Sequence, residues 1–172
     1  MNQPDLVLPS QALNRITPDV IDTENSKATK DKLVQHGYSV GHLNFLIKGL
    51  TQAEIIDDTT IYPVPKCQEG LRGLINVRGS LIPVFDMKTL LDLENKDKEH
   101  ILVLGKEDNA IAILIDSLPS QPALENKMQQ TPPIHNLISE YVDHTYMDTT
   151  SNVWMEFDYE RFFLDKATEF NH

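Results

Sequence analysis

The sequence predicts an all-β protein assembled as small barrels, and three observations support this fold class. Short apolar runs rich in β-branched and aromatic residues recur along the chain, with turn signals roughly every ten residues. The clearest hairpin spans residues 73–86, where Leu74–Val77 and Leu81–Phe85 flank the reversal Arg78-Gly79-Ser80. With 172 residues, 40% of them hydrophobic, the chain can form one ordinary domain or two small β subdomains that share a core.

The first part of the chain divides into a polar segment and a region of strand formers. Residues 1–32 are polar and contain prolines, which predicts a flexible lead-in. Strand formers begin at Gly37, and residues 37–47 indicate a strand or a bulged pair of strands. Ala53–Asp57 is a second short strand candidate. Pro63-Val64-Pro65 cannot occupy a central strand and therefore predicts a loop or an edge crossing.

The middle of the chain combines a charged loop with two strongly apolar strands. Residues 88–93 predict a short helix or turn, and Glu94–Glu99 a solvated loop. Ile101–Leu104 and Ala110–Asp116 are almost wholly apolar, which is typical of strands buried on both faces. Prolines then mark residues 119–133 as a connection.

The end of the chain predicts two helices and a last hairpin. Apolar residues recur at helical spacing over 134–140, which predicts a short helix. Tyr141–Met147 and Val153–Phe157 indicate a hairpin with a polar reversal. Asp158 can then cap a final helix over 159–167.

Composition and charge disfavour several classes of protein. The formal net charge of −11 argues against nucleic acid as a partner, because phosphate backbones need clustered Lys and Arg. The longest purely apolar run, Ala110–Ile115, is far too short to span a bilayer, so no membrane insertion is expected. The N-terminus lacks the charge pattern of a secretory signal, and a single Cys67 excludes an internal disulfide, so we expect a cytoplasmic protein.

Residues capable of chemistry are present but form no reactive constellation. The six histidines show no helical metal-binding pair, and phosphate-binding glycine loops and nucleophile elbows are missing, so we predict no cofactor or metal site. Asp86, Asp116 and Asp158 each follow an apolar run and could together hold a divalent ion or perform acid–base chemistry. Aspartates at strand ends more often cap the next helix or turn. A small acidic metal-dependent hydrolase that uses these three residues is therefore the alternative to a non-enzymatic protein.

The 73–86 hairpin and its surroundings closely resemble the signature of the CheW-like domain, which is found in chemotaxis coupling proteins. The family pattern is P-x-P, a short spacer, G-h-h-N-h-R-G (h is apolar), two residues, and h-P-h-h-D. The resemblance covers residues 36–166. The corresponding residues here are Pro63, Pro65, Gly73, Asn76, Arg78, Gly79, Pro83 and Asp86.

Two further features resemble the PilI-type adaptors of type IV pilus chemosensory systems. One is residues 41–47 leading into 53–56, and the other is the ending Trp154–Asp158. The chain also departs from the family pattern, since Ala112 stands where a glycine is usual and Gly70 where a bulkier residue is usual.

The resemblance implies both a fold and a function. The fold would be two SH3-like five-stranded β-barrel subdomains that share a hydrophobic seam. The function would be that of a non-enzymatic adaptor, without cofactors, that couples the cytoplasmic tip of a methyl-accepting chemoreceptor to the regulatory domain of a CheA-like histidine kinase. Such an adaptor would work in the cytoplasm at membrane-associated receptor arrays. For this chain the resemblance implies the arrays that control twitching motility. A module that sequesters the kinase instead of bridging it is a related possibility.

On this resemblance, partner contacts are expected at the signature hairpin and at the strand before it. Arg78 is the first candidate, because its planar guanidinium suits directional contacts. It could instead brace its own loop by pairing with Asp86 or Glu69. Gly73 and Gly79 are expected to serve backbone shape. The other candidates for partner contacts are Asn76, Ile55, Ile56, Leu74 and Ile75. In the alternative interpretation the four aliphatic residues are core residues. Pro83 and Asp86 complete the structural motif.

Overall fold

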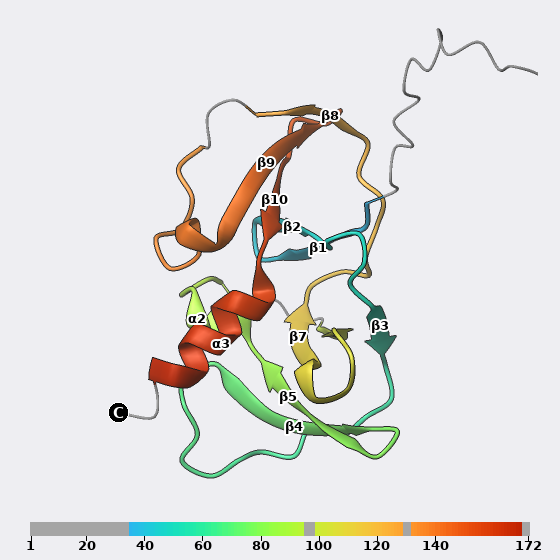
Figure 1. The fold of residues 1–172 in the computed structure, drawn as a ribbon, viewed down its shortest axis with the longest axis vertical. Coiled ribbons are helices and arrows are strands. Elements are labelled where there is room, and N and C mark those ends of the chain that lie inside the picture. Colours follow the sequence, from blue (N-terminus) through green and yellow to red (C-terminus); the bar gives the residue numbers. More distant parts are fainter. Residues whose placement is uncertain (1–34, 95–98, 129–131, 170–172) are drawn as a thin grey trace, which may run out of the picture. The chain divides into compact units, whose positions relative to one another are not determined.

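The described part of the chain forms two five-stranded sheets with short helices (Figure 1). The computed structural model describes residues 35–94, 99–128 and 132–169. The first sheet has the order β1 (Gly37–Val40), β2 (Leu43–Leu46), β10 (Val153–Phe157), β9 (Val142–Asp148), β8 (Leu124–Lys127). The second has the order β3 (Ala53–Ile56), β6 (His100–Leu104), β7 (Ile111–Ile115), β5 (Ser80–Phe85), β4 (Leu71–Val77). The helical elements are α2 (Met87–Leu90), η2 (Glu107–Asn109), η3 (Ser139–Tyr141) and α3 (Tyr159–Glu169).

In each sheet, the chain segment that contains one edge strand also forms backbone hydrogen bonds with the strand at the opposite edge. In the second sheet β3 pairs with β6, and Tyr62, a little further along, exchanges hydrogen bonds of 2.8 and 2.9 Å with Leu74 on β4. In the first sheet Ser120 pairs with Gly37 on β1, and the same segment continues as β8 beside β9. Strand edges that would otherwise expose backbone groups are therefore partly covered.

The two sheets share one hydrophobic core. Its buried residues come from the first sheet, the second sheet, α2 and α3, and aromatic rings lie at its centre. The ring centroids of Phe45 and Phe157 are 5.2 Å apart, and those of Phe157 and Phe162 are 5.4 Å apart, spacings typical of favourable aromatic packing. A second cluster covers the other face of the second sheet: Ile75, Ile82, Val84, Ile101, Val103, Ala110, Ala112 and Leu114.

Most strands predicted from the sequence are confirmed. The 37–47 region is a hairpin of β1 and β2, the signature region is the β4–β5 hairpin, and β9 and β10 form the last hairpin. Strands β6 and β7 pair antiparallel and are buried on both faces, as their apolar sequences predict. Asp158 caps α3, since its carboxylate accepts a hydrogen bond of 3.1 Å from the backbone of Arg161.

Two predictions between residues 119 and 141 are wrong. The predicted helix over 134–140 is a turn followed by the 3₁₀ helix η3. Ile138 and Tyr141 reach the core from these turns, so their burial does not need a helical backbone. The connection after residue 119 contains β8, whose sequence carries no apolar alternation and which is held by backbone hydrogen bonds to β9. Residues 1–32 and most of the 94–99 loop lie outside the described residues.

The structure shows how the two residues that depart from the family pattern, Ala112 and Gly70, are accommodated by packing. Ala112 is fully buried on β7, where its methyl group contributes to the second cluster. Gly70 has a φ of 82°, and a Cβ atom there would collide with the side chain of Leu90. A glycine at position 70 therefore lets Leu90 pack against the backbone.

Candidate functional site

The signature hairpin ends in a tight two-residue turn. Val77 pairs with Ser80, and the two residues between them, Arg78 and Gly79, have φ values of 52° and 91°. Positive φ at both positions is the geometry of a type I′ turn. The Asn76 side chain stabilises this turn, because its Oδ1 accepts a hydrogen bond of 2.9 Å from the backbone of Gly79.

Arg78 extends from this turn and has a partner within the chain. Its Nη2 lies 2.6 Å from Oε1 of Glu54 on β3, while 73% of its side chain remains exposed. Neither acid suggested by the sequence is this partner, so the prediction of pairing with Asp86 or Glu69 is corrected to Glu54. Sequence reasoning missed Glu54 because it lies on a strand at the opposite edge of the sheet order from β4.

Asp86, at the end of the signature, is buried and makes four hydrogen bonds. Its carboxylate accepts bonds from the backbone of Lys88 (3.0 Å) and Thr89 (3.2 Å), which caps α2. It also accepts bonds from the Thr89 hydroxyl (2.9 Å) and from Nη1 of Arg72 (3.1 Å). This carboxylate is therefore committed to holding α2 against the hairpin.

Gly73 and Pro83 fit the close packing of this hairpin. A Cβ atom on Gly73 would collide with the backbone of Tyr62, and the φ of Gly73 is 147°. Pro83 lies opposite Leu74, which already uses its N–H and C=O groups for Tyr62. The absent N–H of Pro83 therefore leaves no group of Leu74 unpaired.

The aliphatic candidates lie on different surfaces. Ile55 and Ile56 are both partly buried, but Ile55 packs against the shared core and Ile56 against the second cluster. Leu74 is partly buried, whereas Ile75 is fully buried inside the second cluster. Alternation along β3 and β4 thus separates residues that are neighbours in the sequence.

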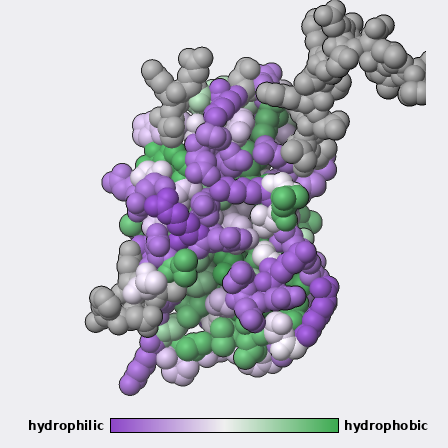
Figure 2. Space-filling model, viewed as in Figure 1, coloured by the Kyte–Doolittle hydropathy of each residue, from purple (hydrophilic) through white to green (hydrophobic). Residues whose placement is uncertain are grey.

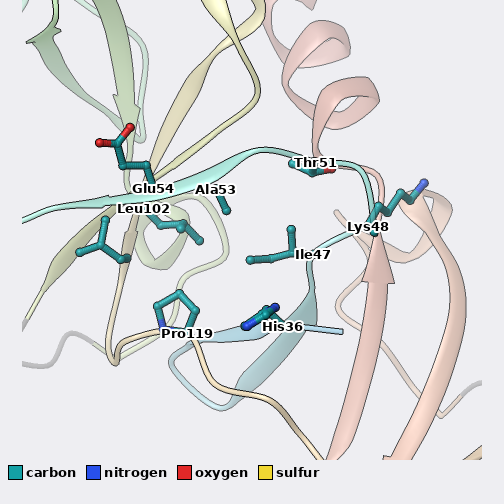
Figure 3. Close-up of a pocket in the computed structure, with 10 residues that line it drawn as sticks. His36, Ile47, Lys48, Thr51, Ala53, Glu54, Leu102 and Pro119 are labelled. Carbon is teal, nitrogen blue, oxygen red and sulfur yellow. The ribbon is translucent and has the colours of Figure 1, made fainter. Parts of the chain in front are cut away.

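A groove lies where the two sheets meet, and we call it the inter-sheet groove. It encloses about 290 Å³ and is lined by His36, Ile47, Lys48, Gly49, Thr51, Ala53, Glu54, Ile55, Leu102 and Pro119. Figure 3 shows Ile47, Leu102 and Pro119 around one hollow, with Lys48 and Glu54 at its two ends. Ile55 is the only one of the sequence-predicted contact residues that lines it. The other lining residues come from four separate segments, so no local pattern in the sequence groups them.

The rim of the groove carries an ion-paired lysine, Lys48. Burial alone would lower the pKa of Lys48, but the hydrogen bond to Asp143 and the nearby carboxylates raise it overall. Lys48 Nζ lies 2.8 Å from Asp143 Oδ2 and 3.6 Å from Asp158 Oδ2. The hydrogen bond from Lys48 in turn lowers the pKa of Asp143. Leu50, in the loop beside this rim, is fully exposed.

A second apolar surface lies on the outer face of the signature hairpin, and we call it the hairpin strip. It comprises Tyr62, Leu74, Leu81 and Pro83, which share a face because Leu74 pairs with both Tyr62 and Pro83. Tyr62 is 60% exposed and Leu81 is 65% exposed. Figure 2 shows hydrophobic side chains gathered at the surface over the β4–β5 end of the molecule.

The three aspartates of the alternative hydrolase do not form one site. Asp86 caps α2, Asp158 caps α3 and lies near Lys48, and Asp116 is paired with Lys88 at 2.6 Å. Within residues 35–94, 99–128 and 132–169, no group of three His, Cys, Asp or Glu side chains is arranged to hold a metal ion. Among the helices of this same part of the chain, none is long and apolar enough to cross a membrane.

Comparison with known proteins places this geometry in a family. The sequence model of the CheW-like domain matches residues 37–166. A chemotaxis protein CheW of Thermotoga maritima is 31% identical over 64 residues, which are 36% of this chain and 42% of the relative. A chemotaxis protein CheW of Treponema pallidum is 24% identical over 107 residues, 57% of this chain and 63% of the relative. The chain thus matches less than two thirds of the length of either relative.

Solved structures of similar fold include a scaffolding protein. The crystal structure of scaffolding protein TtCheW from Thermoanaerobacter tengcongensis superposes with a TM-score of 0.57 at 18% sequence identity. The match covers 75% of this chain and 90% of that protein. At this identity the likeness concerns the fold alone.

Proposed function

Because the chain belongs to the CheW-like domain family, we propose that it is a scaffold that couples a methyl-accepting chemoreceptor to a CheA-like histidine kinase. CheW-like scaffolding proteins are non-enzymatic. The observation that carries the proposal is the family match over residues 37–166. The geometry supports it, because a scaffold that bridges two partners needs two separate docking surfaces, and the inter-sheet groove and the hairpin strip meet this need.

The receptor tip docks in the inter-sheet groove in this proposal. The groove has an apolar floor of Ile47 and Leu102 and a polar rim, a combination suited to an amphipathic helical segment. Ile55 is a contact residue here. The exposed Leu50 lies beside the groove and can cover apolar surface of a bound helix.

The regulatory domain of the kinase docks on the hairpin strip. Apolar side chains that are already exposed there lose water on binding, and Arg78 adds a directional contact at the turn. Leu74 and Asn76 are contact residues on this surface. Ile75 and Ile56 support it from the second cluster beneath.

We also propose that each sheet closes into an SH3-like barrel. The support is that the segment containing one edge strand of each sheet also bonds the opposite edge strand, at Tyr62–Leu74 and at Gly37–Ser120. The ion pair between Arg78 and Glu54 further links the β4–β5 turn to β3. The folded domain would span residues 36–166, with 1–32 as a separate lead-in.

The resemblance of residues 41–47, 53–56 and 154–158 to PilI-type adaptors supports a role in type IV pilus arrays. We propose a cytoplasmic protein that is recruited to these membrane-associated arrays. Deletion of the gene should abolish twitching zones while leaving flagellar swimming intact. Loss of swimming with normal twitching would point to a flagellar chemotaxis system instead.

Binding measurements with purified components test the coupling function. Full-length protein should bind both a receptor tip fragment and the CheW-like regulatory domain of the kinase, and should form a ternary complex with them. A kinase complex that excludes the receptor would indicate sequestration instead of bridging. Failure to bind either partner at array-like concentrations would refute the scaffold proposal.

A further inference from the structure

We propose that Lys88 is a positioning residue for the inter-sheet groove, acting through its buried ion pair with Asp116. This inference rests on the proposed function, because it assigns the determinant of receptor docking to a residue outside the groove. The groove-lining segment after β7 is the element through which Lys88 acts.

Lys88 occupies an unusual place for a lysine. It lies in α2, directly after the signature hairpin, and its side chain is only 2% exposed. Its Nζ lies 2.6 Å from Asp116 Oδ1 and 3.5 Å from Glu99 Oε1. A charge buried to this extent is stable only when an oppositely charged group lies close to it. The position of Lys88 is therefore coupled to that of Asp116.

Asp116 transfers this coupling to the first sheet. Its other carboxylate oxygen, Oδ2, accepts a hydrogen bond of 2.6 Å from the backbone of Gly41 in the β1–β2 turn. Its own backbone N–H donates to the carbonyl of Ser39 on β1 at 3.1 Å. One aspartate therefore joins α2, the end of β7 and β1, that is, elements of both sheets.

The segment from Asp116 to Ser120 contributes one residue, Pro119, to a wall of the groove. It is fixed to β1 at its two ends, by Asp116 with Ser39 and by Ser120 with Gly37. Pro119, between these two attachments, lines the groove. Loss of the Asp116 attachment would leave this segment fixed at Ser120 only, and Pro119 would shift relative to β3.

The lysine contributes to the position of Asp116, together with the hydrogen bonds that join Asp116 to Gly41 and Ser39. Without Lys88 the Asp116 carboxylate, 9% exposed, would have to recruit water or turn toward solvent. Either response changes its bonds to the β1–β2 turn. The hairpin strip is held by backbone pairing within the second sheet and would keep its geometry.

The test compares the effect of substitutions at Lys88 on two binding affinities, that for the receptor tip and that for the kinase regulatory domain. Lys88→Met keeps the length of the side chain and removes the charge, and we expect the affinity for the receptor tip to fall about tenfold. The affinity for the kinase regulatory domain should remain within about twofold. Lys88→Arg should restore receptor binding in part. Lys127→Met, an exposed lysine change on β8, is the matched control and should leave both affinities unchanged.

A second measurement tests the geometry of the groove in the absence of any binding partner. Spin labels at Gln52→Cys and Leu118→Cys, in a Cys67→Ser background, report the separation of the two walls. Lys88→Met should broaden or shift the distance distribution. If Lys88→Met does not fold, the double variant Lys88→Met/Asp116→Asn removes the uncompensated charge and keeps an amide oxygen that can accept from Gly41, and it should fold while showing the same shift.

The outcomes separate this inference from the proposed function. If the wild-type protein does not bind the receptor tip, the proposed function fails and the spin-label distances alone decide the role of Lys88. If the wild-type protein binds but a folded Lys88 variant binds equally well with unchanged distances, Lys88 is not a positioning residue.

Discussion

The guanidinium of Arg78 and the carboxylate of Glu54 form an ion pair with a separation of 2.6 Å, which links the tip of the β4–β5 hairpin to β3. Only Nη2 of Arg78 takes part in this pair, and most of the side chain faces solvent. The sequence left open whether Arg78 braces its own fold or contacts a partner. The structure shows the internal pair and leaves further guanidinium donors exposed, so one residue can serve both roles.

Reversal of the charge at Arg78 should weaken partner binding more than folding. In Arg78→Glu we expect a loss of kinase-domain affinity of about tenfold, because an interface arginine often makes a large contribution to binding. The free energy of unfolding should change by less than about 1 kcal/mol, since exposed ion pairs contribute little. Titration binding and chemical denaturation measure the two effects.

The charge-swapped double variant Glu54→Arg/Arg78→Glu is the control for this prediction. It restores an internal ion pair of opposite orientation but leaves a carboxylate at the turn. If it recovers full kinase-domain binding, Arg78 acts only as a brace.

Filling the inter-sheet groove should block the receptor alone. Ala53 is exposed and lines the groove, so Ala53→Trp places an indole ring in the docking space with little effect on the core. We expect receptor-tip affinity to fall at least about tenfold, with kinase-domain binding unchanged. Thr149→Trp, in the exposed β9–β10 turn, is the matched control. Equal receptor binding by wild type and Ala53→Trp would place the receptor site elsewhere.

The buried Asp148 should make a pH-dependent contribution to stability. Burial alone would raise its pKa, but hydrogen bonds from the side chains of Trp154, Thr150 and Asn152 and from the backbone of Asn152 lower it well below the usual range. A carboxyl group whose pKa is lower in the folded state stabilises the fold above its unfolded pKa, about 4, and loses that contribution as pH falls below it.

Asp148→Ala should therefore lower the free energy of unfolding by about 2 to 3 kcal/mol near neutral pH, because it leaves Trp154 Nε1 without the carboxylate 2.8 Å away. The difference from wild type should shrink between about pH 5 and about pH 3. Urea denaturation across this range measures it. A difference that is independent of pH would show that the ionised carboxylate is not the stabilising species.

Gly73 should tolerate no side chain. In Gly73→Ala the new methyl group meets the backbone of Tyr62, so the pairing between Tyr62 and Leu74 must break or shift. We expect a loss of stability of about 1 to 3 kcal/mol. Because Tyr62 and Leu74 belong to the hairpin strip, kinase-domain binding should weaken as well.

Gly49→Ala is the control for this substitution, since a Cβ atom at Gly49 meets nothing within 4 Å. Its thermal unfolding midpoint should match that of wild type. A Gly73→Ala protein as stable as wild type would mean that the Tyr62 segment can move away from β4 at little cost.

Features encoded locally were predicted well from the sequence. The β4–β5 hairpin follows from two apolar runs around Arg78-Gly79, since Gly79 readily accepts the positive φ that the turn requires there. The double burial of β6 and β7 follows from their continuous apolar sequences. The helix at Tyr159 follows from its aspartate cap.

Features that depend on distant partners were missed. Strand β8 has a polar sequence and exists because β9 offers it backbone hydrogen bonds. The spacing over 134–140 suggested a helix, yet Ile138 and Tyr141 enter the core from turns. The partner of Arg78 is likewise on another strand, so residues near the hairpin in sequence were the wrong candidates.

The sequence by itself determined the family signature, the hairpins, the apolar strands of the second sheet and the caps of α2 and α3. Each of these depends on residues within a few positions of one another, and local backbone preferences and hydrogen bonds act over that range. Only the tertiary structure decided that Lys88 meets Asp116, that Arg78 meets Glu54, and that four separate segments line one groove. These contacts depend on how the two sheets pack around their shared core, which is a property of the whole chain and not of any segment.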